Sequence, residues 1–213
     1  MKLRYDAVAF DLLTGLLDSW TLWNRVAGGP AAGRRWRVAY LGLTYGAGRY
    51  RPYQELVAES AQATGLPATV ATQLALRWGE LALWPEARSV LTRLQGRVKL
   101  AIVTNCSEYL AAAAVDRTGM DFAVVVSAER VGWYKPHPRP YQLALQELGL
   151  PADRVLFVAG SPADIAGAAG VGMPVFWHNR IGLPMPALPD ATRHRLLGTA
   201  DSLHPLIPLV LSQ

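Results

Sequence analysis

Cysteine is almost absent from this chain, and so is any long polar tract. Cys106 is the single cysteine in 213 residues, so no disulfide can form within the chain, and nothing in the sequence indicates an oxidising compartment. Apolar residues make up 51% of the sequence and charged residues 17%, which excludes a disordered or collagen-like protein. The length suits one α/β domain with an insertion, or two small domains, with a buried core.

The sequence also lacks an uninterrupted apolar segment of the kind that a signal peptide or a membrane span needs. Asp6 and Asp11 interrupt the apolar stretch near the basic N-terminus. Residues 155–177 are strongly apolar, but they contain Asp164, prolines and many glycines, which indicate a strand-turn-helix-strand unit. We therefore expect a cytoplasmic protein without a membrane partner.

Lysine is scarce in a chain that carries a net charge of +5. Lys2, Lys99 and Lys135 are the only lysines, and the many arginines are scattered except in two short clusters, at 34–37 and 193–195. Nucleic-acid binders concentrate positive charge along one face, so we expect no nucleic-acid partner and interpret the first cluster as a solvated helix face. The basic balance also agrees with a small anionic substrate.

Short apolar runs alternate with helical patterns over most of the chain. The runs predict five buried parallel strands: Ala7–Phe10, Val98–Val103, Phe122–Val126, Val155–Ala159 and Pro174–Trp177. Helical periodicity predicts the intervening helices Glu86–Leu94, Glu108–Thr118, Pro138–Leu148 and Pro162–Ala169. This alternation predicts an α/β fold with a doubly wound (Rossmann-like) parallel sheet.

The first crossover is too long for a single helix. Between Leu17 and Trp84 only helical patterns occur, at Ser19–Ala27, Arg35–Gly46, Pro52–Thr64 and Pro67–Gly79, and five tryptophans accompany them. We expect a helical cap over residues 17–84, inserted into an α/β core of residues 1–16 and 85–213. The Pro- and Leu-rich tail is expected to close the sheet edge with a short helix near Leu203–Leu211.

Polar residues follow several of the predicted strands. They are Asp11 to Thr14 after the first strand, Thr104 to Ser107 after the second, Ser127 after the third, and Gly160 to Asp164 after the fourth, with Lys135 in a loop leading into a helix. Singly, each could simply terminate a turn or a helix. Ligands of open parallel sheets bind beyond the carboxyl ends of the strands, and two buried carboxylates require a cation between them, so together these residues indicate a site.

These segments resemble the motifs of the haloacid dehalogenase superfamily of hydrolases. The motifs are Phe10-Asp11-Leu12-Leu13-Thr14-Gly15, Val103-Thr104-Asn105, Lys135-Pro136, and Gly160-Ser161-Pro162-Ala163-Asp164 followed by Gly167-Ala168. Phosphatases of the superfamily carry a second aspartate two positions after the nucleophile, as general acid, where this chain has Leu13. A halide leaving group needs no proton, so Leu13 is compatible with carbon–halogen cleavage.

The L-2-haloacid dehalogenase branch is the most similar. Phosphonate-cleaving relatives use a cap lysine, and no lysine occurs between Lys2 and Lys99. Trp36-Arg37 resembles the branch's cap segment, and Tyr134-Lys135-Pro136 with Tyr141 resembles its third motif.

The resemblance implies a role for each matching residue. Asp11 is then the nucleophile, Lys135 positions its carboxylate, and Asp164 helps activate water for the second step. Thr104 binds the substrate carboxylate, Arg37 and Asn105 receive the halide, Tyr141 supports the lysine region, and Thr14 and Ser161 complete the substrate-binding set. From the sequence alone, Arg37 is equally well an exposed helix arginine, and Tyr141 an ordinary packing residue.

The chain departs from the branch at several motif positions. Leu13 replaces a tyrosine, Thr14-Gly15 reverses the usual glycine-threonine order, and Ala159 and Ser161 stand where a serine and an asparagine are expected. The reversal predicts that the threonine is displaced from its usual hydrogen bond.

Three functions follow from these observations. The first is a 2-haloacid dehalogenase that needs no cofactor or metal, acts on a small 2-haloalkanoate and forms a homodimer. The second is a slow phosphatase or phosphotransferase with Mg²⁺ at Asp11, Asp164 and the Leu13 carbonyl. The third is a non-catalytic binding module on the same scaffold.

Overall fold

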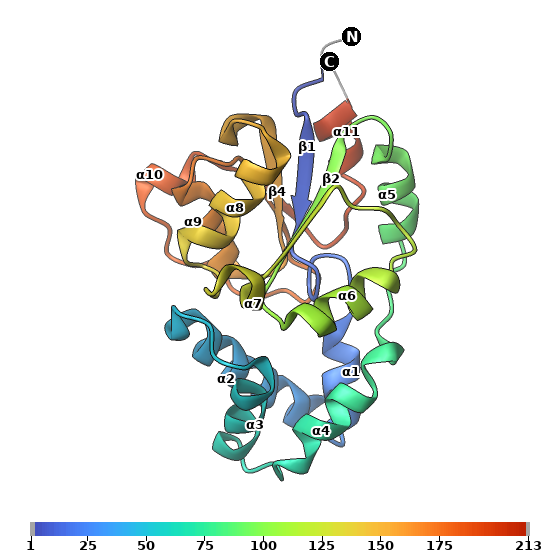
Figure 1. Ribbon diagram of the computed structural model, residues 1–213, viewed down its shortest axis with the longest axis vertical. Helices are drawn as coiled ribbons and strands as arrows, with labels where there is room; N and C mark the ends of the chain where they lie inside the picture. The colour runs from blue at the N-terminus through green and yellow to red at the C-terminus, as the bar shows by residue number, and fades with distance from the viewer. Residues whose placement is uncertain (1–2, 212–213) are drawn as a thin grey trace.

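A six-stranded parallel sheet organises the chain in the computed structural model, which describes residues 3–211 (Figure 1). The strands are β1 (Ala7–Phe10), β2 (Lys99–Thr104), β3 (Val124–Ser127), β4 (Val155–Ala159), β5 (Val175–His178) and β6 (Leu196–Ala200). Their order across the sheet is β3-β2-β1-β4-β5-β6, and every neighbouring pair is parallel. This is the doubly wound, Rossmann-like α/β class that the sequence predicts.

Both faces of the sheet are covered by helices, because side chains alternate along each strand between two apolar clusters. Val8 and Phe10 of β1 belong to the cluster shared with α5 (Ala87–Leu94) and α6 (Glu108–Asp116). Ala7 and Ala9 belong to the opposite cluster, shared with α8 (Pro138–Leu148) and α9 (Pro162–Gly170). The sheet therefore lies between two layers of helices, as a doubly wound fold requires.

Residues 17–84 form a group of helices, called here the helical segment, beyond the carboxyl ends of the strands (Figure 1). It comprises α1 (Ser19–Val26), α2 (Pro30–Ala47), α3 (Tyr53–Ala63), α4 (Thr69–Leu76) and a 3₁₀ turn at Trp78–Glu80. Trp23, Trp36 and Tyr40 pack ring against ring, with centroids 4.3 and 5.1 Å from Trp23. The aromatic residues thus supply the segment's own core.

Two helix boundaries in the helical segment differ from the prediction. Helix α2 begins at Pro30 rather than at Arg35, because proline at a first helical position sacrifices no hydrogen bond. The last predicted helix is split into α4 and the 3₁₀ turn. Arg34 and Arg35 are exposed on α2, as a solvated face requires, whereas Trp36 and Tyr40 are buried.

The tail was predicted correctly only in part: a short helix is present, but it does not close the sheet edge. Strand β6 forms the sheet edge beside β5, whereas helix α11 (Leu206–Leu211) is shorter than expected and packs against α5. Residues of β6 alternate between partly buried and exposed, so the strand lacks the continuous apolar run that marks the others. The short helices α7 (Ala128–Val131) and α10 (Asp190–Arg193) and the 3₁₀ turn Ala152–Arg154 span too few residues to show periodicity. Within residues 3–211 no helix is both long and apolar enough to cross a membrane.

Candidate active site

An ammonium group joins two carboxylates at the carboxyl edge of the sheet. Asp11 directly follows β1, Asp164 lies in the first turn of α9 after β4, and Lys135 lies in the loop before α8. Lys135 Nζ is 2.8 Å from Asp11 Oδ1 and 3.1 Å from Asp164 Oδ1. All three side chains are buried, with exposed fractions of 2–6% for the residues. The strand ends therefore bring together the three residues predicted to be catalytic.

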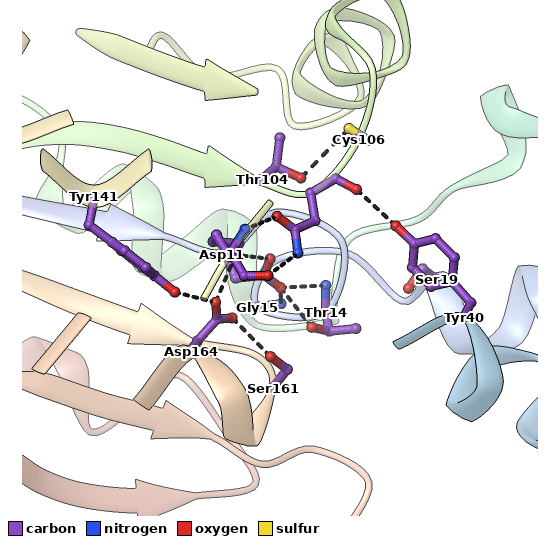
Figure 2. A network of polar contacts seen from close by, with 12 residues as sticks. Asp11, Thr14, Gly15, Ser19, Tyr40, Thr104, Cys106, Tyr141, Ser161 and Asp164 are labelled. Carbon is purple, nitrogen blue, oxygen red and sulfur yellow. Dashed lines mark hydrogen bonds and ion pairs between the residues drawn. The ribbon is translucent and has the colours of Figure 1, made fainter. Parts of the chain in front are cut away.

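The two oxygens of Asp11 have different surroundings. Oδ2 accepts hydrogen bonds from Thr14 Oγ1 at 2.6 Å, from Thr14 N at 3.0 Å and from Gly15 N at 3.0 Å (Figure 2). Gly160 packs on the same side, where a Cβ would lie 2.5 Å from Oδ2. Oδ1 accepts only the Lys135 ammonium among residues 3–211. Oδ1 therefore has fewer hydrogen bonds than Oδ2.

The reversed order Thr14-Gly15 does not displace the threonine, contrary to the prediction. Thr14 donates from both its hydroxyl and its backbone N–H to the same carboxylate oxygen. A Cβ at position 15 would overlap the Asp11 carbonyl, so only glycine lets the chain turn there.

Asp164 is held by two hydroxyl groups in addition to the lysine. Tyr141 Oη donates to Oδ1 at 2.9 Å and Ser161 Oγ donates to Oδ2 at 3.1 Å (Figure 2). Tyr141 is fully buried and bonds to this carboxylate, so it is more than a packing residue. Ser161 likewise reaches the site through Asp164.

The two carboxyl groups have opposite pKa shifts. Burial alone would raise the pKa of Asp11, but the Lys135 charge and the Thr14 donors outweigh it, and the pKa falls below its ordinary value. Burial, together with the neighbouring Asp11 charge, raises the pKa of Asp164 in spite of Lys135. Burial opposes the charge of Lys135, but the two carboxylates keep its pKa raised. Asp11 is thus the stable anion, and Asp164 is the group suited to exchange a proton.

Arg37 of α2 is a second buried cation, and it forms no ion pair with an acidic residue among residues 3–211. The residue is 2% exposed, so it is not the exposed helix arginine that the sequence also allowed. Nη2 donates to Ser19 Oγ at 3.1 Å, whereas Nε and Nη1 have no hydrogen-bond partner among residues 3–211. Its Cζ lies 4.6 Å from the ring centroid of Trp23 and 5.2 Å from that of Tyr40. A guanidinium that lies among aromatic rings without a carboxylate has N–H groups that can bind an anion.

Thr104 is the last residue of β2 and Asn105 follows it, but the two side chains lie differently. The Asn105 side chain donates to the Lys135 carbonyl at 3.0 Å and accepts from the Lys135 N–H at 2.7 Å, which fixes the lysine loop. Tyr40 Oη also reaches the Asn105 carbonyl at 2.9 Å. Thr104 is fully buried, and its hydroxyl contacts Cys106 Sγ at 3.6 Å.

A small cavity connects these groups. Its volume is about 20 Å³, and it is lined by Asp11, Leu13, Thr14, Arg37, Tyr40, Leu41, Tyr45, Asn105, Lys135, Ser161 and Asp164. Thr104 and Tyr141 are not among the lining residues. Tyr40, Leu41 and Tyr45 were not predicted from the sequence to lie in the site. The helical period offered a signal for two of them, because Leu41 and Tyr45 follow Arg37 at steps of four residues and so share its helix face. In the part of the chain that the structure describes, no group of three His, Cys, Asp or Glu side chains could hold a metal ion.

Comparison with known proteins agrees with this geometry. The family model for haloacid dehalogenase-like hydrolases matches residues 5–172. The chain belongs to this hydrolase family. It is 31% identical over 194 residues to an (S)-2-haloacid dehalogenase of Pseudomonas putida, which covers 83% of this chain and 87% of the relative.

Solved structures of dehalogenases have the same fold as this chain. One L-2-haloacid dehalogenase matches with a TM-score of 0.84 and 27% identity, covering 98% of this chain and all of the other. A second, from Xanthobacter autotrophicus with chloropropionic acid covalently bound, matches with a TM-score of 0.74 and 26% identity, covering 84% of this chain and 79% of the other. The family and the doubly wound fold are therefore as the resemblance implied.

Proposed function

We propose that this hydrolase is a 2-haloacid dehalogenase that replaces the halogen of a small 2-haloalkanoate with a hydroxyl group through an aspartyl ester. One observation carries the proposal: the anion Asp11 and the unpaired cation Arg37 line the same cavity of about 20 Å³. The first is a nucleophile and the second a receptor for the departing halide. The covalent complex of the Xanthobacter autotrophicus dehalogenase supports the covalent route.

In the first step, Asp11 Oδ1 attacks the halogen-bearing carbon from the side opposite the halogen. A carbon–oxygen bond forms, the carbon–halogen bond breaks, and the halogen leaves with the bonding electrons as halide. Arg37 and the free N–H of the Asn105 amide would hold the halide. No proton is needed, which agrees with the apolar Leu13 in the cavity wall.

In the second step, water attacks the ester carbon Cγ of Asp11. Asp164 accepts a proton from the water, and the three donors around Oδ2 stabilise the charge that develops there. The intermediate then expels the Oδ1 alkoxide, which takes the proton back from Asp164 to become the hydroxy acid. Asp11 is left as a carboxylic acid with one oxygen from water, and it loses its proton to solvent, which restores the carboxylate.

The remaining predicted residues would act around these steps. Lys135 positions Asp11, and Tyr141 and Ser161 position Asp164. Thr104 is proposed to reach the substrate carboxylate, which requires its hydroxyl to leave Cys106. Residues 17–84 would serve as the cap that excludes water, and residues 1–16 and 85–213 as the core.

The proposal extends to the substrate, the location and the oligomeric state of the protein. The substrate would be a small haloacid, the protein would act in the cytoplasm, and two copies would form a homodimer. The phosphatase and binding-module hypotheses are not favoured, because the relatives of 29–31% identity that cover most of the chain are dehalogenases.

A single-turnover reaction in isotopically labelled water tests the proposal. With 2-chloropropionate and a chelator present, we expect halide release and one labelled oxygen in Asp11. Asp11→Asn should lose halide release by a factor of at least about 10⁴. Asp18→Asn is the matched control, because Asp18 is the half-buried residue that caps α1 and asparagine also caps helices. Label found only in the product, or phosphate release that depends on Mg²⁺, would contradict the proposal.

A further inference from the structure

We propose that Trp84 and His178 are positioning residues for the nucleophile, because they hold the two backbone carbonyls of the loop that binds Asp11 Oδ2. Neither residue lines the cavity, and neither belongs to the motifs of the sequence analysis. Trp84 lies before α5, and His178 is the last residue of β5. They reach the loop from different parts of the fold, Trp84 from the end of the helical segment and His178 from the sheet.

Trp84 and Asp11 bind opposite sides of one peptide group. The indole Nε1–H donates to the Thr14 carbonyl at 3.0 Å, and the N–H of the same peptide, that of Gly15, donates to Asp11 Oδ2 at 3.0 Å. A hydrogen bond to the carbonyl polarises the peptide and strengthens its N–H as a donor. The peptide is therefore fixed in orientation and is a stronger donor to the carboxylate.

His178 holds the next carbonyl. Its Nδ1 is 2.8 Å from the Gly15 carbonyl oxygen, which can only accept, so Nδ1 carries the proton. The residue is 1% exposed, and its ring meets the Trp84 ring edge to face with centroids 6.1 Å apart. Trp84 and His178 thus pack against each other, and each donates a hydrogen bond to the loop.

The surroundings of His178 maintain this arrangement. Burial lowers the pKa of His178, and the Glu86 carboxylate, 3.7 Å from Nε2, opposes that shift. Arg180 neutralises Glu86 at 3.2 Å, and the Leu203 N–H binds the same oxygen at 3.1 Å. Whether neutral or protonated, the ring keeps Nδ1–H on the Gly15 carbonyl.

The consequence for the reaction concerns Asp11 Oδ2. Because Trp84 and His178 hold the carbonyls of the loop, its three donors stay on Oδ2, and Oδ1 faces the substrate in the first step. The same donors meet the negative charge on Oδ2 in the second step. This part of the inference rests on the proposed function, whereas the effect on the Asp11 carboxylate does not.

Substitutions that separate the hydrogen bond from the packing test the inference. Asparagine places an N–H near the position of Nδ1, whereas leucine has no donor, so His178→Asn is compared with His178→Leu. Trp84→Phe removes only the indole N–H and part of the ring, and Trp177→Phe is its control, because the buried Trp177 Nε1 has no hydrogen-bond partner in the described residues.

Two measurements are made on each variant: haloacid kinetics, and carboxyl NMR titration of Asp11. We expect His178→Leu and Trp84→Phe to lower kcat about three- to tenfold with little change in KM, and to raise the pKa of Asp11. His178→Asn should recover most of both losses, and Trp177→Phe should leave both unchanged.

The inference is wrong if His178→Asn and His178→Leu behave alike, or if the Asp11 pKa does not move in His178→Leu and Trp84→Phe. The titration needs no substrate. If the wild-type protein releases no halide, the proposed function fails, and the titration alone still decides whether the two residues act on Asp11.

Discussion

The cavity brings together two buried cations whose surroundings differ. Lys135, at the edge of the sheet, contacts two carboxylates, whereas Arg37, in the helical segment, contacts aromatic rings and one serine hydroxyl. Both residues are 2% exposed, so water does not solvate either charge well. A buried charge that has an ionic partner in the protein contributes to the folded structure. A buried charge without such a partner can be neutralised by a ligand of opposite charge.

This difference separates stability from function. Removing Lys135 would leave two carboxylates close together without a cation, so under the proposed function we expect harm to the fold and to the reaction. Removing Arg37 would relieve a buried, unpaired charge, so we expect harm to the reaction alone. The following substitutions test this contrast.

Lys135→Met has the largest expected effect. We expect loss of activity by a factor of about 10³ and a fall in the free energy of unfolding of about 3–5 kcal/mol, because a buried ion-pair network loses its only cation. Halide release and chemical denaturation measure the two effects. Lys99→Met, at an exposed strand position, is the control. Normal stability in Lys135→Met would show that the carboxylates do not need the ammonium.

Asp164→Asn is expected to separate the two chemical steps. The first step should proceed and the ester should accumulate, with turnover lowered about 10²–10³-fold, because no group accepts the water proton. Intact-protein mass spectrometry would detect the ester.

The wild-type pH profile provides a second test of Asp164. Burial raises the carboxyl pKa of Asp164, and this cause persists in the ester, where Asp11 carries no charge, so ester hydrolysis should slow as the pH falls through the pKa of Asp164. Asp164→Asn should abolish this acid limb. An unchanged limb would assign the proton to another group.

Arg37→Met is expected to lower activity about 10²-fold while leaving the free energy of unfolding unchanged or higher. The unpaired guanidinium and its aromatic surroundings favour this outcome, since methionine fills an apolar pocket without a charge. Arg35→Met, two positions away on the exposed face of α2, is the control. Destabilisation together with retained activity would make Arg37 a structural residue.

The sequence predicts one of these two regions better than the other. Asp11, Lys135 and Asp164 could be assembled from sequence because the carboxyl ends of parallel strands meet at one edge. The environment of Arg37 could not be predicted, because the packing of the helices decides which side chains of α2 face the sheet. Pro30 extends that helix, and Leu41 and Tyr45 reach the cavity through this packing.

The hydrogen bonds around Asp11 were beyond sequence reasoning for another reason. The order Thr14-Gly15 suggested a displaced threonine, but the conformation of a tight turn decides where its N–H groups point. Trp84 and His178 are remote in sequence from that turn, and only the fold brings them to its carbonyls. Strand β6 was missed because an edge strand needs little apolar sequence to pair.

Halide binding gives the smallest and most direct test of the contrast between the two cations. If Arg37 awaits an anion, bromide at ten times its dissociation constant should raise the free energy of unfolding of the wild-type protein by about 1.4 kcal/mol. Arg35→Met should respond like the wild type, and Arg37→Met should keep only the general effect of salt, which all three proteins share. Thermal unfolding with and without bromide measures the difference. An equal response in Arg37→Met would mean that the halide binds elsewhere, and the unpaired guanidinium would then need a different anion.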